Sequence, residues 1–125
     1  MKLRLQSNSL RLRLKRAEVA QLAAGDLVEE KIIFGPGQAL CYRLEAMPNI
    51  KTPRAIFRNS NVTVEIPAEM ATTWASSDQV GIEEVQDAGA GIQLRILIEK
   101  DFACLNGPME QNVDTFPNPN AGTSC

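Results

Sequence analysis

The chain has 125 residues, of which 44% are hydrophobic and 22% are charged, and its formal net charge is −2. This composition is typical of a folded globular domain and excludes a disordered chain, which carries fewer apolar residues and a larger net charge. No apolar run approaches the roughly 18 residues of a membrane-spanning helix, and the start of the chain lacks the apolar segment of a secretory signal. We therefore expect a cytoplasmic protein with no membrane contact.

The inventory of side chains predicts a protein without enzymatic activity. Histidine is absent, so the commonest general base and the commonest metal ligand are both missing. Cys41, Cys104 and Cys125 are odd in number and widely spaced, and none belongs to a CxxC pair. We therefore expect reduced thiols, no metal and no cofactor.

Charge is divided unevenly along the chain. Residues 1–62 hold eleven lysines and arginines against five acids, a net charge of +6, whereas residues 63–125 hold two against ten, a net charge of −8. Such polarity can attract a charged partner. It can equally hold the two halves together within one fold, and we favour this second interpretation.

The first predicted elements are the two strands of a β-hairpin. Leucines alternate with cations on both sides of the turn-forming segment Ser7-Asn8-Ser9. We expect the leucine face to enclose the interior of the protein. That face consists of Leu3, Leu5, Leu10, Leu12 and Leu14.

A short helix and two further strands follow the hairpin. Residues 16–25 have the apolar stripe, the acid in the first turn and the terminal glycine of a short helix. Residues 27–34 and 39–45 are typical of strands, and a Gly-Pro-Gly turn separates them. In the last strand Tyr42 shares the face of the leucines, and Cys41 lies on the opposite face.

The second half of the chain resembles the first. A shift of 52 positions lays residues 3–33 on residues 55–85 without a gap, and Pro67 then falls at the first position of a second helix. A second glycine turn, at 89–91, precedes a last strand at 92–99. The apolar positions match in the pairs Leu5 and Phe57, Leu10 and Val62, Leu12 and Val64, Leu14 and Ile66, Leu22 and Trp74, and Val28 and Val80.

These elements predict a mainly β domain with two short helices, in which a tandem ββαββ repeat forms a pseudo-twofold, swapped-hairpin-like barrel of about eight strands. The domain covers residues 1–106, with repeats at about 2–46 and 54–100, and residues 107–125 form an irregular acidic tail. Two unrelated hairpin and helix segments would give a similar pattern, and this alternative stays open.

Each half resembles the swapped-hairpin unit of the AbrB/MazE family. The segments LRLQSNSLRLRLKRAEVAQLAAGDLVEEKI and AIFRNSNVTVEIPAEMATTWASSDQVGIEEV share an Asn-Ser hairpin tip, a strand that runs into a short helix, and a Gly-Asp or Ser-Asp turn. Members of that family are dimers that interleave their hairpins and bind DNA as transcriptional regulators or antitoxins. The resemblance implies that here such a dimer is fused into one chain.

A second resemblance covers the whole length of the chain. The segments SLRLRL, SSDQVGIE, EKDFACL and FPNPN are similar to those of a small bacterial family of uncharacterised proteins. This resemblance implies a bacterial protein and assigns it no biochemical role.

The polar face of the first hairpin is the main candidate site. It gathers six cations, namely Lys2, Arg4, Arg11, Arg13, Lys15 and Arg16. A polyanion or a protein partner would find its contacts there. The alternatives are a solvated face and a face neutralised by the acidic half. In the second half the corresponding positions lack most of this charge, since they include Ile56, Thr63, Glu65 and Pro67.

We therefore predict a non-enzymatic binding or accessory module that engages an unknown protein partner, as a monomer or a weak homodimer. The alternative is an AbrB/MazE-like DNA-binding regulator or antitoxin, although half of the basic surface of such a dimer is missing. A third hypothesis is a reactive thiol at Cys104, activated by the neighbouring Lys100; a small buried cysteine explains the same residue, and we favour it.

Overall fold

The computed structural model describes residues 1–102, 114 and 116, and it is mainly β with two short helices, as the sequence predicts. The first half contains β1 (Lys2–Gln6), β2 (Ser9–Leu14), α1 (Arg16–Ala23), β3 (Val28–Gly35) and β4 (Gln38–Met47). The second half contains β5 (Arg54–Arg58), β6 (Asn61–Pro67), α2 (Ala68–Ala75), β7 (Gly81–Gly89) and β8 (Ile92–Lys100). Within these residues no helix is long and apolar enough to cross a bilayer. The predicted tail at 107–125 lies outside the described residues, apart from Asp114 and Phe116.

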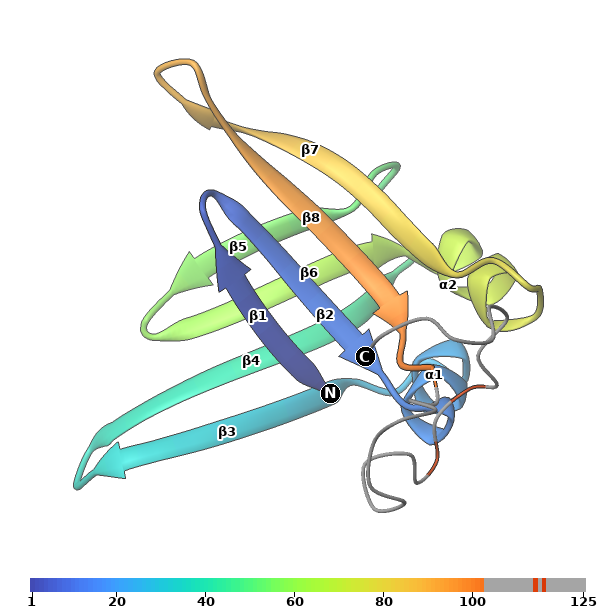
Figure 1. The fold of residues 1–125 in the computed structure, drawn as a ribbon, viewed down its shortest axis with the longest axis horizontal. Helices are drawn as coiled ribbons and strands as arrows, with labels where there is room; N and C mark the ends of the chain where they lie inside the picture. The colour runs from blue at the N-terminus through green and yellow to red at the C-terminus, as the bar shows by residue number, and fades with distance from the viewer. Residues whose placement is uncertain (103–113, 115, 117–125) are drawn as a thin grey trace.

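The eight strands form two four-stranded sheets, and each sheet takes one hairpin from each half of the chain. The strand order is β1-β2-β8-β7 in one sheet, called sheet A here, and β3-β4-β6-β5 in the other, called sheet B. Each hairpin is antiparallel, and the two central pairs, β2 with β8 and β4 with β6, are parallel. The two helices lie side by side at one end of the molecule, away from the hairpin turns (Figure 1).

The closed barrel that we predicted is wrong. Within the described residues the outer strands β1, β7, β3 and β5 each pair with one neighbour only, so the two sheets stay separate. Where a barrel would need a backbone ladder between sheets, a side chain makes the contact instead. The amide of Gln86 on β7 accepts a hydrogen bond from the N–H of Ala55 on β5 (2.7 Å) and donates one to its carbonyl oxygen (2.9 Å). These bonds occupy the edge of β5 without extending the sheet.

The core lies between the inner faces of the two sheets and the two helices. Leu22 of α1 and Trp74 of α2 are buried against the strands, and the Trp74 indole N–H donates to the carbonyl oxygen of Val80 (3.1 Å). Most of the predicted leucine face is buried, but Leu5 is 65% exposed because it lies on the edge strand β1, whereas its cross-strand neighbour Leu10 on the central strand β2 is 5% exposed. The most completely buried strand residues are Leu12, Leu14, Leu44, Val64, Ile66, Ile96 and Ile98.

The gapless match of the two halves fails after the second helix. Val28 pairs with Leu44 in β4, and the corresponding pair in sheet A is Ile82 with Ile98. The position of Val28 is therefore taken by Ile82, not by Val80, which precedes β7 and is 43% exposed. Ile82 lies two positions further from the end of its helix than Val28 does, so the offset changes from 52 to 54.

The predicted place of Pro67 is wrong by one residue. Pro67 ends β6, where it pairs with Met47, and its ψ of 137° is extended. The helix α2 therefore begins at Ala68. Proline suits this place because it lacks the N–H that the start of a helix leaves without a partner.

Leu12 and Leu5 offer a matched test of this packing, because they belong to the same hairpin and differ in burial. Leu12→Ala should lower the free energy of unfolding by about 2–5 kcal/mol, since it leaves a cavity in a close-packed core. Leu5→Ala should change it by about 0.5 kcal/mol or less. Urea unfolding followed by circular dichroism measures both, and equal losses would contradict the core described above.

Candidate functional site: the basic face of sheet A

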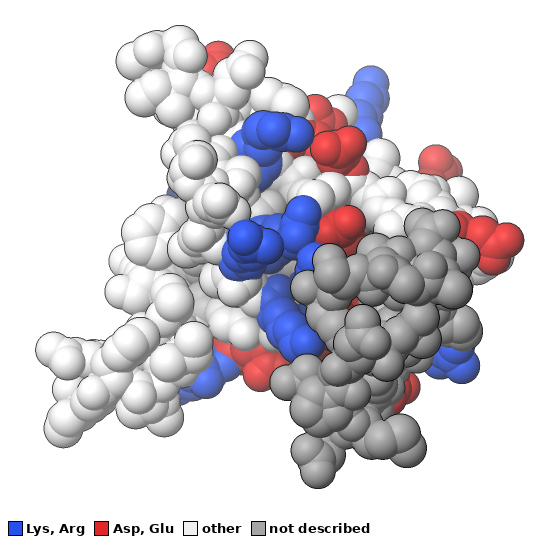
Figure 2. Space-filling view, in the orientation of Figure 1, with Lys and Arg blue, Asp and Glu red and all other residues white. Residues whose placement is uncertain are grey.

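The β1–β2 register brings four of the six predicted cations onto the outer face of sheet A. Lys2 lies directly opposite Arg13, and Arg4 lies directly opposite Arg11. Leu12, between them in sequence, points into the core. Figure 2 shows this face, with cations gathered over the strands of sheet A and carboxylates beside them.

One further cation reaches this face from the other half of the chain. Arg95 of β8 pairs with Ser9 of β2 and alternates with the buried Ile96, so it points outward and is largely exposed. The sequence analysis missed it, because nothing in the alternation indicated that β8 would lie beside β2. We call Lys2, Arg4, Arg11, Arg13 and Arg95 the basic face.

The other two predicted cations, Lys15 and Arg16, lie beyond the end of β2, at the start of α1. The backbone N–H of Arg16 donates to the carbonyl oxygen of Asp114 (2.9 Å), and its guanidinium carbon lies 5.5 Å from the ring centre of Phe116. The Asp114 carboxylate accepts a bond from Ala17 (3.2 Å), where the positive end of the helix favours an anion. Arg16 is thus engaged within the protein.

The basic face contains two pairs of like charges placed directly across neighbouring strands. Cross-strand side chains lie about 4.5–5.5 Å apart at their Cβ atoms, and like charges at that separation destabilise a sheet. The pairs Lys2 with Arg13 and Arg4 with Arg11 therefore cost stability unless carboxylates or a bound anion compensate them.

Carboxylates of the acidic half compensate part of this charge. Lys2 Nζ lies 3.2 Å from Asp101 Oδ2, and Arg11 Nε lies 3.0 Å from Glu99 Oε1. The two halves of the chain therefore attract each other within one fold. This agrees with the interpretation of the uneven charge that we favoured from the sequence. Within the part of the chain that the structure describes, Arg4 and Arg13 make no ion pair, and Arg4 donates only to Gln6 Oε1 (3.0 Å).

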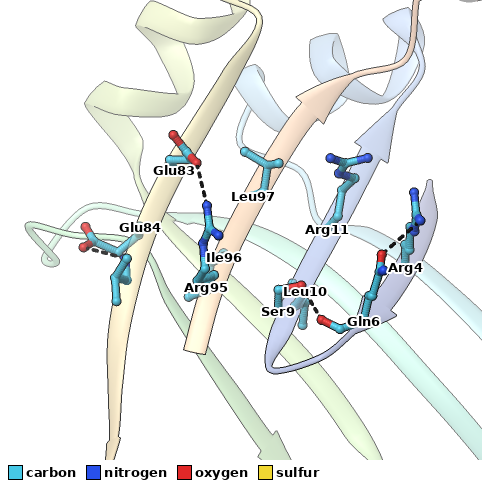
Figure 3. Close-up of a pocket in the computed structure, with 11 residues that line it drawn as sticks. Arg4, Gln6, Ser9, Leu10, Arg11, Glu83, Glu84, Arg95, Ile96 and Leu97 are labelled. Atoms are coloured by element: carbon cyan, nitrogen blue, oxygen red, sulfur yellow. Dashed lines mark hydrogen bonds and ion pairs between the residues drawn. The ribbon is translucent and has the colours of Figure 1, made fainter. Parts of the chain in front are cut away.

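A pocket of about 460 Å³ opens on the basic face (Figure 3). Arg4, Arg11 and Arg95 border it, together with Glu83 of β7, which lies 3.7 Å from Arg95 Nη2. Leu97 lies between Arg11 and Glu83 across the sheet. The pocket thus offers a cationic side and an acidic side, which suits a ligand that presents carboxylates and a few donors.

On the outer face of sheet B two arginines lie beside carboxylates, whereas Arg58 pairs with the uncharged Asn61. Arg43 pairs with Glu29 (3.1 Å), and Arg54 pairs with Glu65 (2.6 Å). Cys41 lies on this face and is 8% exposed, whereas Tyr42 points to the other face of the sheet, as predicted. Arg43 donates to Cys41 Sγ (3.6 Å), and this bond is the main cause that raises the pKa of Arg43.

The sequence profile of a family of unknown function, DUF7009, matches residues 1–120. The chain belongs to the DUF7009 family. This confirms the coarse expectation of a family without an assigned role, while the AbrB/MazE likeness of each half stays a prediction. No curated protein and no solved structure matches the chain.

The thiol hypothesis depends on Lys100, which this DUF7009 chain buries at the end of β8. Its Nζ donates to the carbonyl oxygen of Ser77 (2.7 Å) and lies 6.0 Å from the Trp74 ring and 5.3 Å from the Phe116 ring. Burial lowers the pKa of Lys100 and outweighs the attraction of Asp78. Cys104 lies outside the described residues, so its proposed activation stays a prediction.

Reversing one charge of a like pair should stabilise the protein. Arg4→Glu would place a carboxylate opposite Arg11 and should raise the free energy of unfolding by about 0.2–1 kcal/mol at low salt. The gain should shrink at high salt, because surface charges are screened. Arg58→Glu on β5 is the matched control, since its cross-strand neighbour is the uncharged Asn61. A destabilised Arg4→Glu variant would contradict the cost assigned to the basic face.

Lys100 should make stability depend on pH in the alkaline range. Its folded pKa lies below the ordinary value of 10.5, so between these values the unfolded chain binds more protons than the folded one. The stability of the wild type relative to Lys100→Met should therefore increase as the pH rises from neutral towards 10.5. Urea unfolding of both proteins across this range tests it, and a constant or falling difference would show that burial does not disfavour the charged amine.

Proposed function

We propose that the protein is a non-enzymatic binding module whose basic face engages an acidic surface of a protein partner. The observation that carries this proposal is the placement of like charges directly opposite each other on adjacent strands. A sheet face selected only for stability gains from alternating signs, whereas Arg4 and Arg13 remain unpaired by any described carboxylate. An acidic partner would supply the missing counter-charges.

The distribution of charge supports a protein partner over a nucleic acid. Among the described residues, sheet A has the more basic outer face, since Arg43 and Arg54 of sheet B face Glu29 and Glu65. Glu83 and Glu99 also lie among the cations of sheet A and would repel a continuous line of phosphates. A protein surface can match such a mixed pattern, because it carries charges of both signs.

A DNA-binding regulator or antitoxin of the AbrB/MazE kind is the second candidate, and the interleaving of hairpins favours it. Leu12 pairs with Ile98 at the centre of sheet A, and Val64 pairs with Leu44 at the centre of sheet B. The bulges recur as well, at Ile33/Gly35 and at Asp87/Gly89. These matching registers support a duplicated ββαββ unit with a pseudo-twofold axis, as a fused swapped-hairpin dimer would have.

A pull-down from the native cell with charge-reversed variants tests the first candidate. Arg4→Glu/Arg13→Glu should lose the acidic interactors that the wild type captures, since it removes both unpaired cations. Lys51→Glu/Arg58→Glu changes the net charge equally but alters exposed residues of the β4–β5 loop and β5, and should keep those interactors. If the two double variants capture the same proteins as the wild type, the basic face is not the binding surface.

A fluorescence-anisotropy titration with labelled duplex DNA tests the second candidate. Each neutralised phosphate contributes about −0.9 to the slope of log K against log salt, so contact with several cations of the basic face should weaken binding steeply between about 50 and 200 mM salt. Arg4→Glu/Arg13→Glu should then abolish binding. Negligible binding at the lowest salt would remove the DNA-binding candidate and leave the first unaffected.

A further inference from the structure

β1 forms one border of sheet A, and its outer edge has no strand partner within the described residues (Figure 1). In an antiparallel ladder the backbone groups of alternate residues point away from the neighbouring strand. The corresponding strand β5 shows which residues these are, because the N–H and the carbonyl oxygen of Ala55 make bonds outside the β5–β6 ladder. Leu3 holds the position of Ala55 in β1, since the two hairpins have corresponding registers. The backbone groups of Leu3 and, two residues further on, of Leu5 therefore face the open edge.

A side chain closes the edge of β5 but not that of β1. Gln86 of β7 bonds to both backbone groups of Ala55 (2.7 and 2.9 Å). The registers and bulges of β3 and β7 correspond at an offset of 54, so the residue of β3 in the place of Gln86 is Ile32. An isoleucine side chain has no atom that donates or accepts a hydrogen bond. Among the residues that the structure describes, none occupies the outward backbone groups of Leu3 and Leu5, so these groups can pair with another strand.

The outward side chains of β1 favour an acidic neighbour. β1 contains no acidic residue, and its Lys2 and Arg4 lie on the basic face. Arg4 makes no ion pair in the described part of the chain and has Arg11 directly opposite on β2. A carboxylate on an added strand beside Arg4 would compensate this pair of like charges. The edge therefore suits a strand with acidic residues on its outer face.

The inner face of β1 favours apolar residues at the alternate positions of the same strand. Leu5 is 65% exposed, whereas Leu10, directly opposite on β2, is 5% exposed. Leu3 lies on the same face and packs partly against the core. An apolar residue beside Leu5 would cover it from the open side, because cross-strand neighbours lie about 4.5–5.5 Å apart. Since strand residues alternate between the two faces, the edge suits a segment in which acidic and apolar residues alternate.

Other pairings fit less well. A second copy paired through the same strand would add its own Lys2 and Arg4 to a face that already carries opposed cations. The edge of β7 carries three acids, and that of β3 carries two acids and one lysine, so both suit an acidic segment poorly. β5 also lacks acids, but Gln86 occupies its edge, and Arg54 already lies beside Glu65 (2.6 Å). The open edge of β1 is therefore the one that matches an acidic segment.

We propose that the acidic partner docks as an extended segment that pairs with the free edge of β1. Its acidic residues lie beside Lys2 and Arg4, and its apolar residues lie beside Leu3 and Leu5. The proposal rests on the proposed function and specifies how the partner is held. In such strand addition the backbone hydrogen bonds give affinity and the alternating side chains give specificity. Sheet A gains a fifth strand, and Arg4 gains a carboxylate.

Fluorescence anisotropy with a labelled synthetic peptide tests this mode of binding. The peptide alternates glutamate with valine and is long enough to span the five residues of β1. A second peptide of the same sequence carries N-methyl groups on its backbone amides, so it keeps the charges and loses the hydrogen-bond donors. The protein should bind the first peptide at low salt and the second at least about tenfold more weakly, since several backbone bonds are lost.

Leu5→Pro and Phe57→Pro are matched variants of the two hairpins. Each removes a backbone N–H that points away from the neighbouring strand, so neither loses a ladder bond or changes the charge. Leu5→Pro should weaken binding of the first peptide by about tenfold or more, because the edge of β1 loses a donor and gains a ring, whereas Phe57→Pro should leave binding unchanged. Circular dichroism checks that both variants are folded, and the N-methylated peptide tests the same point on the unaltered protein.

Three results would overturn the pairing at β1: no binding of the first peptide, equal binding of the two peptides, or full binding by folded Leu5→Pro. Equal binding that is lost in Arg4→Glu/Arg13→Glu would show that the basic face holds acidic chains through charge alone, so the proposed function would stand without strand pairing. The pull-down decides the proposed function separately, because it detects acidic interactors however they are held.

Discussion

The parallel pairing of β2 with β8 and of β4 with β6 is the interaction on which the rest of the structure depends. A two-stranded hairpin is at best marginally stable in water, and each of the four hairpins here gains a neighbour only through one of these two ladders. Each ladder joins a strand of the first half to a strand of the second. The core is therefore shared, with Leu12 and Ile98 at the centre of one sheet and Val64 and Leu44 at the centre of the other. Neither half retains a complete core without the other.

The same pairing explains how the uneven charge of the chain is accommodated. The basic hairpin lies beside β8. Glu99, near the end of β8, pairs with Arg11, and Asp101, just after β8, pairs with Lys2. The neutralisation is partial because β7 and β8 provide fewer acids on this face than β1 and β2 provide cations. The charge that remains is concentrated at Arg4 and Arg13, which makes the outer face of sheet A chemically different from that of sheet B although the two sheets have corresponding registers.

Local pattern predicted much of this fold, and long-range pairing accounts for most of what it missed. Alternation located the strands and the buried leucines, because the side-chain period of a strand can be read from the sequence. It could not tell which strands become neighbours, since an alternating strand indicates a face and not a partner. For that reason Arg95 was absent from the predicted site and the sheets were expected to close into a barrel. Leu5 shows a second limit, because its exposure follows from its place on the edge strand β1, which the pattern does not record.

The interleaved topology also has a consequence for biosynthesis. Leu12 and Ile98 are 86 positions apart, so the first hairpin made by the ribosome waits for the last strand before its apolar face is covered. Pairings of such long sequence separation form slowly, because the intervening chain must be ordered first. Until β8 emerges, the leucines of β2 lack the strand that pairs with them in the finished sheet. Transiently exposed apolar surface of this kind favours aggregation, so the interleaved order of strands makes the incomplete chain more vulnerable than the finished one.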